Sequence, residues 1–256
     1  MILLKTAADI EQVRRVGRIV SAAHAVAASH ARSGVELYDL VSIVAGVIDD
    51  SGAVSAFSWT DYAGRRVEPY ACFGVNSRIG TPAFGAHTLR AGEIVNFDTG
   101  CRLEGWCAEA AWPYPVGHVD DERQRLVTEL RRVFETLPQI IHPGATWADV
   151  SHRIARQVDS AGLILIPEIV GHGIGRELHE DPQLSWNPQP FDGVDAIEFR
   201  PGMVIAVECG ITSGCGLLRP LPAGGWETYD RAPCVHGEMT LAVTDRGIDV
   251  LAGPIV

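Results

Sequence analysis

The sequence predicts a single α+β domain in which two similar halves share one largely antiparallel sheet. Three observations lead to this fold class. The chain resembles itself at an offset of 110 residues, each half opens with two segments of helical periodicity, and each half then continues with strand-like segments. Because helices precede strands in each half, the pattern favours α+β over an alternating α/β fold.

The repeat is clearest at glycines, acids and arginines. The residues that recur at the offset are, in pairs, Gly34 and Gly144, Asp39 and Asp149, Asp49 and Asp159, Gly52 and Gly162, Arg90 and Arg200, Gly92 and Gly202, and Gly100 and Gly210. Asp98 also falls on Glu208, so an acid recurs in the same register. We therefore predict one domain, 1–256, formed by an internal duplication with halves at about 1–110 and 111–256, and a ligand site where the halves meet.

The order of elements is the same in each half. Apolar residues at spacings of three and four over 10–20 and 126–134 predict a first helix in both places. The second helices follow a glycine and are predicted over 38–50 and 147–160. Strands, bounded by Gly, Pro and Asn, are predicted within 70–75, 93–112, 204–211 and 238–244.

Composition narrows the choice of partners. The chain has 256 residues and 46% hydrophobic content, enough for a substantial core. Its net charge of −11 comes without any block of Lys or Arg, so neither nucleic acid nor an anionic membrane is an expected partner. No apolar stretch approaches the roughly 18 residues of a membrane-spanning helix. We expect a soluble cytoplasmic protein, a monomer or homodimer, whose six cysteines are reduced thiols.

Two carboxylates within 93–112 are predicted to face each other. The segment has the pattern of a hairpin that turns at 102–105, and pairing of Arg102 with Gly105 would place Asp98 directly opposite Glu109. Opposed like charges destabilise a strand pair. Either one acid holds a proton or a cation lies between them. The alternative is a hairpin face on which both acids point into water.

Three further residues extend this candidate cation site. Glu208 and Glu238 each lie in an apolar strand segment, where a lone acid is costly unless its charge is compensated. His172 lies in the segment GHGIG at 171–175, whose glycines let the backbone turn sharply. With Asp98 and Glu109, the acids carry a charge of −4, which two divalent cations would neutralise. Oxygen ligands with one imidazole suit Mn, Fe, Co or Zn in a paired site.

These motifs resemble those of the pita-bread metallopeptidases, a family that includes methionine aminopeptidase, aminopeptidase P, prolidase and the non-metal enzyme creatinase. The resemblance covers nearly the whole chain and is carried by VNFD at 95–98, GHGIG at 171–175, MVIAVE at 203–208 and EMTLAVTD at 238–245. It implies the pita-bread fold, in which two pseudo-symmetric αα-β halves surround a curved sheet with a dinuclear metal site between them. The length is similar to that of bacterial methionine aminopeptidases.

The resemblance also implies residue roles. The metal ligands would be Asp98, Glu109, His172, Glu208 and Glu238. Glu208 would be the general base as well as a ligand, and His179 in HEDPQ at 179–183 would hydrogen-bond the scissile amide. Cys72 and Trp226 would line the substrate pocket. His236 is a further pocket candidate, because it precedes Glu238 by two residues and therefore shares its strand face.

The chain departs from the family's pattern at two site positions. Glu109 replaces an aspartate, and its extra methylene moves the carboxylate outward by about one C–C bond length. Thr81, in the substrate pocket, stands where the family has a histidine near the leaving amine, and His87 is the nearest histidine that could replace it. Arg65 and Arg66 lie where pocket tyrosines are found in methionine aminopeptidases, which suggests a polar or anionic substrate unless they are exposed loop charges.

The sequence thus predicts a metal-dependent hydrolase resembling methionine aminopeptidase. It would act on a peptide, an amide or a specialised small amine-bearing substrate, through water activated by one or two divalent ions of Mn, Fe, Co or Zn. Two alternatives stay open at this point. One is a non-peptide lyase or other small-molecule metalloenzyme on the same fold, and the other is a catalytically impaired homologue that binds metal or ligand.

Overall fold

The computed structural model describes residues 1–60, 66–81, 86–186, 196–222 and 224–254. Its helices are α1 (Ala7–His30), α2 (Leu37–Asp50), α3 (Asp121–Ile140) and α4 (Trp147–Ser160). The strands of the main sheet are β1 (Val54–Ser55), β4 (Cys72–Val75), β6 (Ile94–Leu103), β7 (Trp106–Pro115), β8 (Ile164–Leu165), β9 (Gly171–Gly173), β10 (Glu180–Leu184), β11 (Val204–Thr212), β14 (Cys234–Thr244) and β15 (Gly247–Ala252). The remaining strands are β2 (Trp59–Thr60), β3 (Arg66–Val67), β5 (Arg78–Ile79), β12 (Leu218–Pro220) and β13 (Trp226–Thr228).

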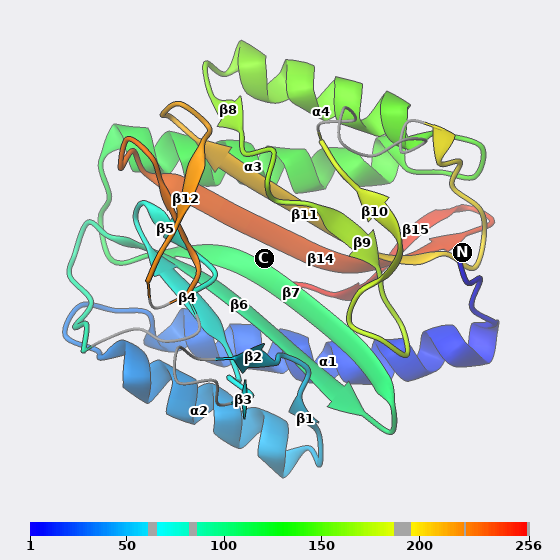
Figure 1. Ribbon diagram of the computed structural model, residues 1–256, viewed down its shortest axis with the longest axis horizontal. Coiled ribbons are helices and arrows are strands. Elements are labelled where there is room, and N and C mark those ends of the chain that lie inside the picture. The colour runs from blue at the N-terminus through cyan, green and yellow to red at the C-terminus, as the bar shows by residue number, and fades with distance from the viewer. Residues whose placement is uncertain (61–65, 82–85, 187–195, 223, 255–256) are drawn as a thin grey trace.

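The main sheet is antiparallel and joins the two halves along its middle. Within the described residues its strand order is β1-β6-β7-β14-β11-β9-β10, with β4 beside β6, β8 beside β11 and β15 beside β14 (Figure 1). Within the sheet, the two halves are therefore joined by the pairing of β7 with β14. This confirms the α+β fold class and the largely antiparallel sheet that the sequence predicted.

One face of the sheet is covered by helices. α1 packs on β6 and β7, and α3 packs on β11 and β14; Figure 1 shows each helix pair along its own half of the sheet. Alternation along the strands sends every second side chain to the helices, such as Phe97 of β6 and Val207 of β11, both fully buried. The residues between them, including Asp98 and Glu208, face the opposite side and are free to build a site.

The 110-residue offset of the sequence is also an offset of the structure. α4 has the bounds of α2 shifted by 110, and β8 has the bounds of β1 shifted by the same number. The isolated bridge between Glu36 and Thr88 recurs between Thr146 and Glu198. Gly92 has a φ of 93° and its counterpart Gly202 a φ of 92°, so both halves need a glycine at the same left-handed turn. The division into halves at 1–110 and 111–256 stays a prediction, and residue 110 lies inside β7.

Two predicted details of the strands are wrong. The β6–β7 hairpin closes on the pair Leu103–Trp106, so Asp98 stands opposite Ala111 and Glu109 opposite Gly100. The two turn residues, Glu104 and Gly105, both have positive φ, as a tight two-residue hairpin turn requires, and this shifts the predicted register by two. The shift leaves Asp98 and Glu109 on one face as diagonal neighbours. In addition, β14 begins at Cys234, so Glu238 lies inside the strand and not at its start.

Two observations bear on the compartment and the membrane. All six cysteines are free, which agrees with the expectation of reduced thiols. Among the described residues, every helix is too short or too polar to cross a bilayer.

Candidate metal centre

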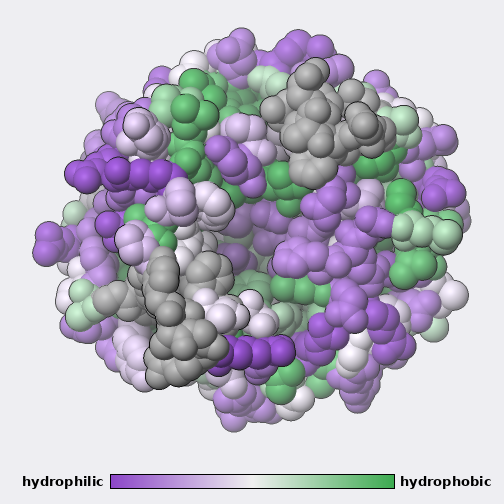
Figure 2. All heavy atoms as spheres, in the orientation of Figure 1, coloured by the Kyte–Doolittle hydropathy of each residue, from purple (hydrophilic) through white to green (hydrophobic). Residues whose placement is uncertain are grey.

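The predicted ligands come from five strands, and the antiparallel registers bring them together on one face. Two lines of cross-strand neighbours each combine ligand-type side chains with small ones. The first line is Cys72, Asp98, Ala111, Glu238 and Glu208; the second, two residues further along each strand, is Gly100, Glu109, Thr240, Ala206 and His172. Long acids next to Ala and Gly have room to converge over the sheet. Figure 2 shows this face hollowed at its centre, with hydrophilic residues at the bottom.

The predicted site residues meet at hydrogen-bonding distances. His172 Nε2 lies 3.2 Å from Glu109 Oε1 and 3.3 Å from Glu208 Oε1. Glu109, His172 and Glu238 are at most 4% exposed. Ligand atoms of these three residues lie within 4.8 Å of one another, which is close enough for one ion. His172 Nδ1 is 2.9 Å from Gly173 O; a proton on Nδ1 leaves Nε2 as the lone-pair nitrogen that faces the acids.

Several of these atoms make no hydrogen bond, although His172 Nε2 and Glu109 Oε1 lie close to each other. Asp98 Oδ1, Glu109 Oε1, His172 Nε2 and Glu238 Oε1 are buried and make no hydrogen bond. Buried polar atoms are normally satisfied, and four orphaned atoms in one cluster call for a group that binds all of them. Three carboxylate oxygens and an imidazole nitrogen are the donor set of a divalent transition metal. The residues therefore fit the metal that the resemblance implies.

Charge in the cluster is compensated only in part by its imidazoles. Burial raises the pKa of Asp98 to about 7 and that of Glu109 to about 8. Burial also raises the pKa of Glu238 well above its usual value. Burial acts in the same direction on Glu208, but the neighbouring imidazoles of His172 and His236 outweigh it and lower the pKa to about 2. Without a cation, burial favours the protonated forms of Asp98, Glu109 and Glu238; divalent ions would allow all four acids to ionise.

Glu109 has the space that its extra methylene requires. Its cross-strand neighbour is Gly100, and a Cβ there would stand only 3.0 Å from the Cβ of Glu109. The backbone of Glu109 is fixed by Thr240, whose hydroxyl donates to Glu109 O and accepts from Glu109 N–H. The longer acid is thus directed toward His172 on a fixed strand.

The residues predicted for the substrate pocket are not all in one place. Cys72 stands directly across the strand pair from Asp98, and His236 lies 3.2 Å from Glu208, so both belong to the acid cluster. Thr81 is buried, its hydroxyl has no partner, and it lines a cavity of about 600 Å³ beside Phe73 and Arg78. Trp226 is 42% exposed. Its role in the pocket stays a prediction.

His179 lies beside the ligands at the rim of the site. Its ring packs edge to face on that of His172, with 4.3 Å between the centroids, and it is exposed to solvent on its other side. Partial burial, and then the charge of His172, lower the pKa of His179. A neutral imidazole at this place can donate a hydrogen bond to a group bound next to the metal ligands.

The other residues singled out in the sequence lie apart from the acid cluster. His87 pairs with Glu93, with 3.1 Å between Nε2 and Oε2, and lines the same cavity as Thr81, so its role at the leaving group stays a prediction. Arg66 is exposed and pairs with Glu68. Arg65 lies outside the described residues.

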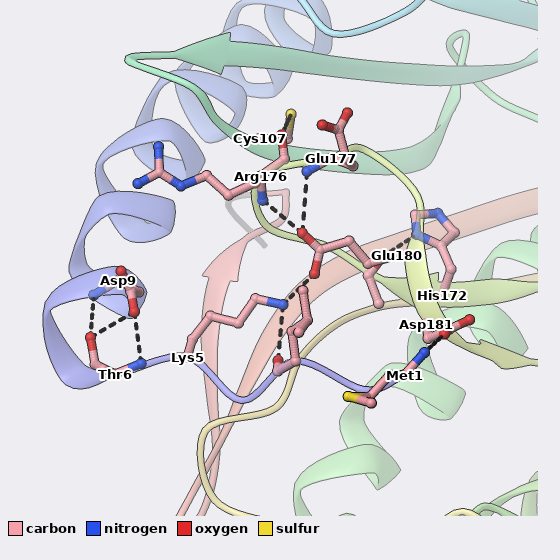
Figure 3. Close-up of polar contacts among 12 residues, drawn as sticks. Met1, Lys5, Thr6, Asp9, Cys107, His172, Arg176, Glu177, Glu180 and Asp181 are labelled. Carbon is pink, nitrogen blue, oxygen red and sulfur yellow. Dashed lines mark hydrogen bonds and ion pairs between the residues drawn. The ribbon is translucent and has the colours of Figure 1, made fainter.

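The N-terminal segment contacts the start of β10, next to the connection from β9 in which His179 lies, a contact that the sequence analysis missed. Lys5 forms a buried ion pair with Glu180, whose Oε1 also accepts hydrogen bonds from the backbone N–H groups of Arg176 and Glu177 (Figure 3). The α-amino group of Met1 pairs with Asp181. Lys5 and Glu180 are 175 residues apart in the chain, so no local sequence pattern predicts their contact.

Fold and site together define a metal-dependent hydrolase of the pita-bread fold. Residues 11–245 match the model of Metallopeptidase family M24, and the chain belongs to that family. It is 32% identical to methionine aminopeptidase 1 of Bacillus subtilis, a match that covers 98% of this chain and 99% of that one. Among solved structures, methionine aminopeptidase of Thermotoga maritima superposes with a TM-score of 0.89 at 31% identity, over 99% of this chain and 100% of that chain. Prolidase of Pyrococcus furiosus shares the fold, with a TM-score of 0.75 at 18% identity, over 97% of this chain and 64% of that one.

Proposed function

We propose that this protein is an aminopeptidase that hydrolyses the bond after the first residue of a peptide, with methionine as the first residue to test. The observation that carries the proposal is the buried cluster of three carboxylates and an imidazole, each with a ligand atom that makes no hydrogen bond. The relatives named methionine aminopeptidase, which match nearly the whole chain, support the choice of substrate class.

The proposed centre holds one or two divalent ions of Mn, Fe, Co or Zn, bound by Asp98, Glu109, His172, Glu208 and Glu238. When bound, such ions lower the pKa of water from about 15.7 toward neutrality and polarise the scissile carbonyl. Glu208 takes the proton from the attacking water and passes it to the leaving amine. Its low pKa keeps Glu208 ionised, and its side chain stands between two imidazoles that stabilise the charge.

His179 positions the substrate in this proposal. Its neutral ring lies next to His172 at the open rim, where it donates a hydrogen bond to the scissile amide. This donor strengthens its interaction as negative charge develops on the carbonyl oxygen.

Thr81 and Glu109 make the proposed reaction slow toward ordinary methionine peptides. A hydroxyl at position 81 cannot take a proton at neutral pH as an imidazole would, and loss of a group in acid–base work costs about 10²–10⁴ in rate. The longer carboxylate of Glu109 changes how that acid reaches the ions. Substitution of these two residues therefore tests the function directly.

The test combines metal content with turnover. Purified protein is analysed for bound metal and then assayed with Met-Ala-Ser and with its N-acetylated form, which lacks the free amine. We expect bound metal, cleavage of the free peptide only, and higher turnover in Glu109→Asp and Thr81→His. Metal binding without cleavage by any of the three proteins would contradict an aminopeptidase and favour chemistry on a non-peptide substrate.

A cytoplasmic location and a monomeric or homodimeric state stay predictions from the sequence. Size-exclusion chromatography with light scattering would decide the second.

A further inference from the structure

His236 occupies a special place in the duplicated sheet. Glu109 of β7 stands opposite Gly100 of β6, and His236 of β14 stands opposite Gly210 of β11. Gly100 and Gly210 are one of the pairs that recur at the 110-residue offset. His236 is therefore the counterpart in the second half of Glu109 in the first, and Glu109 is one of the acids of the metal centre.

The contacts of His236 agree with this placement. Its Nε2 lies 3.2 Å from Glu208 Oε2, while His172 Nε2 lies 3.3 Å from the other oxygen, Oε1. Glu208 thus stands between two imidazoles, one from the strand on each side of β11. Ligand atoms of His236, Glu208 and Glu238 lie within 4.8 Å of one another, as do those of Glu109, His172 and Glu238. Glu238 belongs to both groups.

The backbone at His236 is fixed before any ligand arrives. Its N–H donates to Asn96 Oδ1 at 3.0 Å, and Asn96 Nδ2 donates to Cys234 O and Arg78 O, both at 3.1 Å. Asn96 is 2% exposed and His236 is 5% exposed. A preset and buried imidazole that faces two acids has the properties of a metal ligand.

We propose that His236 is a sixth ligand of the metal centre, so that His172 and His236 would share two divalent ions with the carboxylates of Asp98, Glu109, Glu208 and Glu238. This inference rests on the metal centre of the proposed function and adds a residue to it. Each ion then has one imidazole. Imidazole nitrogen favours Fe, Co and Zn over Mn and Mg, which prefer oxygen, so the chain selects the later metals at both positions.

The competing role for His236 is that of a hydrogen-bond donor that only orients Glu208. The two roles differ in whether His236 coordinates the bound metal. A ligand contributes a nitrogen to the inner coordination sphere, whereas an orienting residue does not. Loss of an outer partner typically lowers metal affinity by about 10–100-fold, and loss of a ligand is expected to exceed that range.

The experiment uses the full chain stripped of metal and titrated with Co²⁺ and with Mn²⁺ by calorimetry. The proteins are wild type, His236→Gln, His172→Gln as the reference for loss of a ligand, and His179→Gln as the control for loss of a nearby imidazole. We expect two Co²⁺ sites in wild type. One of them should weaken more than 100-fold in His236→Gln, with a smaller loss for Mn²⁺, while His179→Gln should keep wild-type affinities.

X-ray absorption of the Co²⁺-loaded wild type gives a readout that does not depend on the folding of any variant. An average of one imidazole per Co²⁺ with both sites filled supports the proposal. One imidazole for every two ions, together with a loss of less than 100-fold in His236→Gln, overturns it and leaves the proposed function intact. Failure of wild type to bind any metal would overturn the proposed function, and this inference with it.

Discussion

Asp98 and Glu208 occupy the same position of the 110-residue repeat, yet their surroundings differ. Glu208 lies between His172 and His236, whereas the strand neighbours of Asp98 in the same line are Cys72 and Ala111. Burial raises the pKa of Asp98 to about 7, while the two imidazoles lower that of Glu208 to about 2. The repeat contains two equivalent carboxylates, and the strands beside them favour the charged form of Glu208 more than that of Asp98.

Equivalent positions in the helices also differ between the two halves. His24 of α1 and Phe134 of α3 are equivalent by the offset, and both are buried against the sheet. His24 hydrogen-bonds Tyr114 and the carbonyl of Ala110, while Phe134 packs its ring on Trp112. At this one position the first half therefore has a titratable imidazole and the second half an aromatic ring that does not titrate. The repeated backbone thus places two residues at equivalent positions. The side chains at those positions differ between the halves, and so do their charge and chemistry.

The largest effect is expected from exchanging the two equivalent acids for their amides. Glu208→Gln removes the proposed base together with a ligand, so turnover should fall by about 10²–10⁴-fold and should not recover with added metal. Asp98→Asn removes a ligand only, and excess Co²⁺ should restore much of the turnover. Steady-state kinetics over a series of metal concentrations measures both. Equal and irreversible losses in the two variants would mean that their surroundings do not distinguish their roles.

A large effect on stability is expected when the ion pair between Lys5 and Glu180 is broken. Lys5→Met leaves Glu180 charged and buried without its cation, which should lower the free energy of unfolding by about 3 kcal/mol. Urea denaturation gives the value. Arg18→Met is the control, since Arg18 pairs with Glu11 in an exposed position and should change stability by about 0.5 kcal/mol or less. A loss for Lys5→Met as small as for Arg18→Met would show that the pair does not stabilise the fold.

His24 should make the first half sensitive to acid. Burial lowers its pKa to about 4 from 6.5, so at pH values between these the unfolded chain binds more protons than the folded chain. Stability due to this residue is therefore present above about pH 6.5 and is lost as the pH falls toward 4. Between about pH 7 and pH 5, wild type should lose about 2 kcal/mol more than His24→Phe, which copies the residue of the second half. Parallel stability curves for the two proteins would refute this prediction.

The smallest effect concerns the caps of the second helices. Thr146 forms a capping box with Asp149 at the start of α4, but its counterpart Glu36 makes no side-chain cap at the start of α2. Asp39 already stands at the position equivalent to Asp149. Glu36→Thr should complete the box and stabilise the protein by up to about 1 kcal/mol, while Thr146→Ala should destabilise it by about the same amount. Thermal unfolding of both variants would show whether the two helix starts are interchangeable.

Much of the frame could be predicted from local pattern. Apolar spacing located the four helices, and 147–160 coincides with α4, because an amphipathic helix carries its period in contiguous residues. The hairpin register was predicted two residues away from the observed one. Both turns are possible in this segment, and the choice depends on the backbone conformation of Glu104 and Gly105. The error did not move the acids off their shared face, since a shift by two preserves alternation.

The site was predicted in part for the same reason. Asp98, Glu109, His172, Glu208 and Glu238 do converge, and each was found from a motif or from an acid in an apolar run. The position of His236 beside Glu208 was not predicted. His236 precedes Glu238 by two residues, so the sequence placed it on the correct face of the strand. Its neighbour on β11, however, depends on the register between two long strands. No pattern in the sequence predicted the ion pair between Lys5 and Glu180.

By itself the sequence determined the 110-residue repeat, the α+β class and the type of each candidate ligand, because these follow from period, composition and the cost of burying an acid. Only the tertiary structure decided which of the repeated acids has imidazoles beside it and which glycine leaves space for Glu109. Those facts depend on the register between strands more than 100 residues apart, and register is fixed by the packing of the whole sheet and not by any one segment.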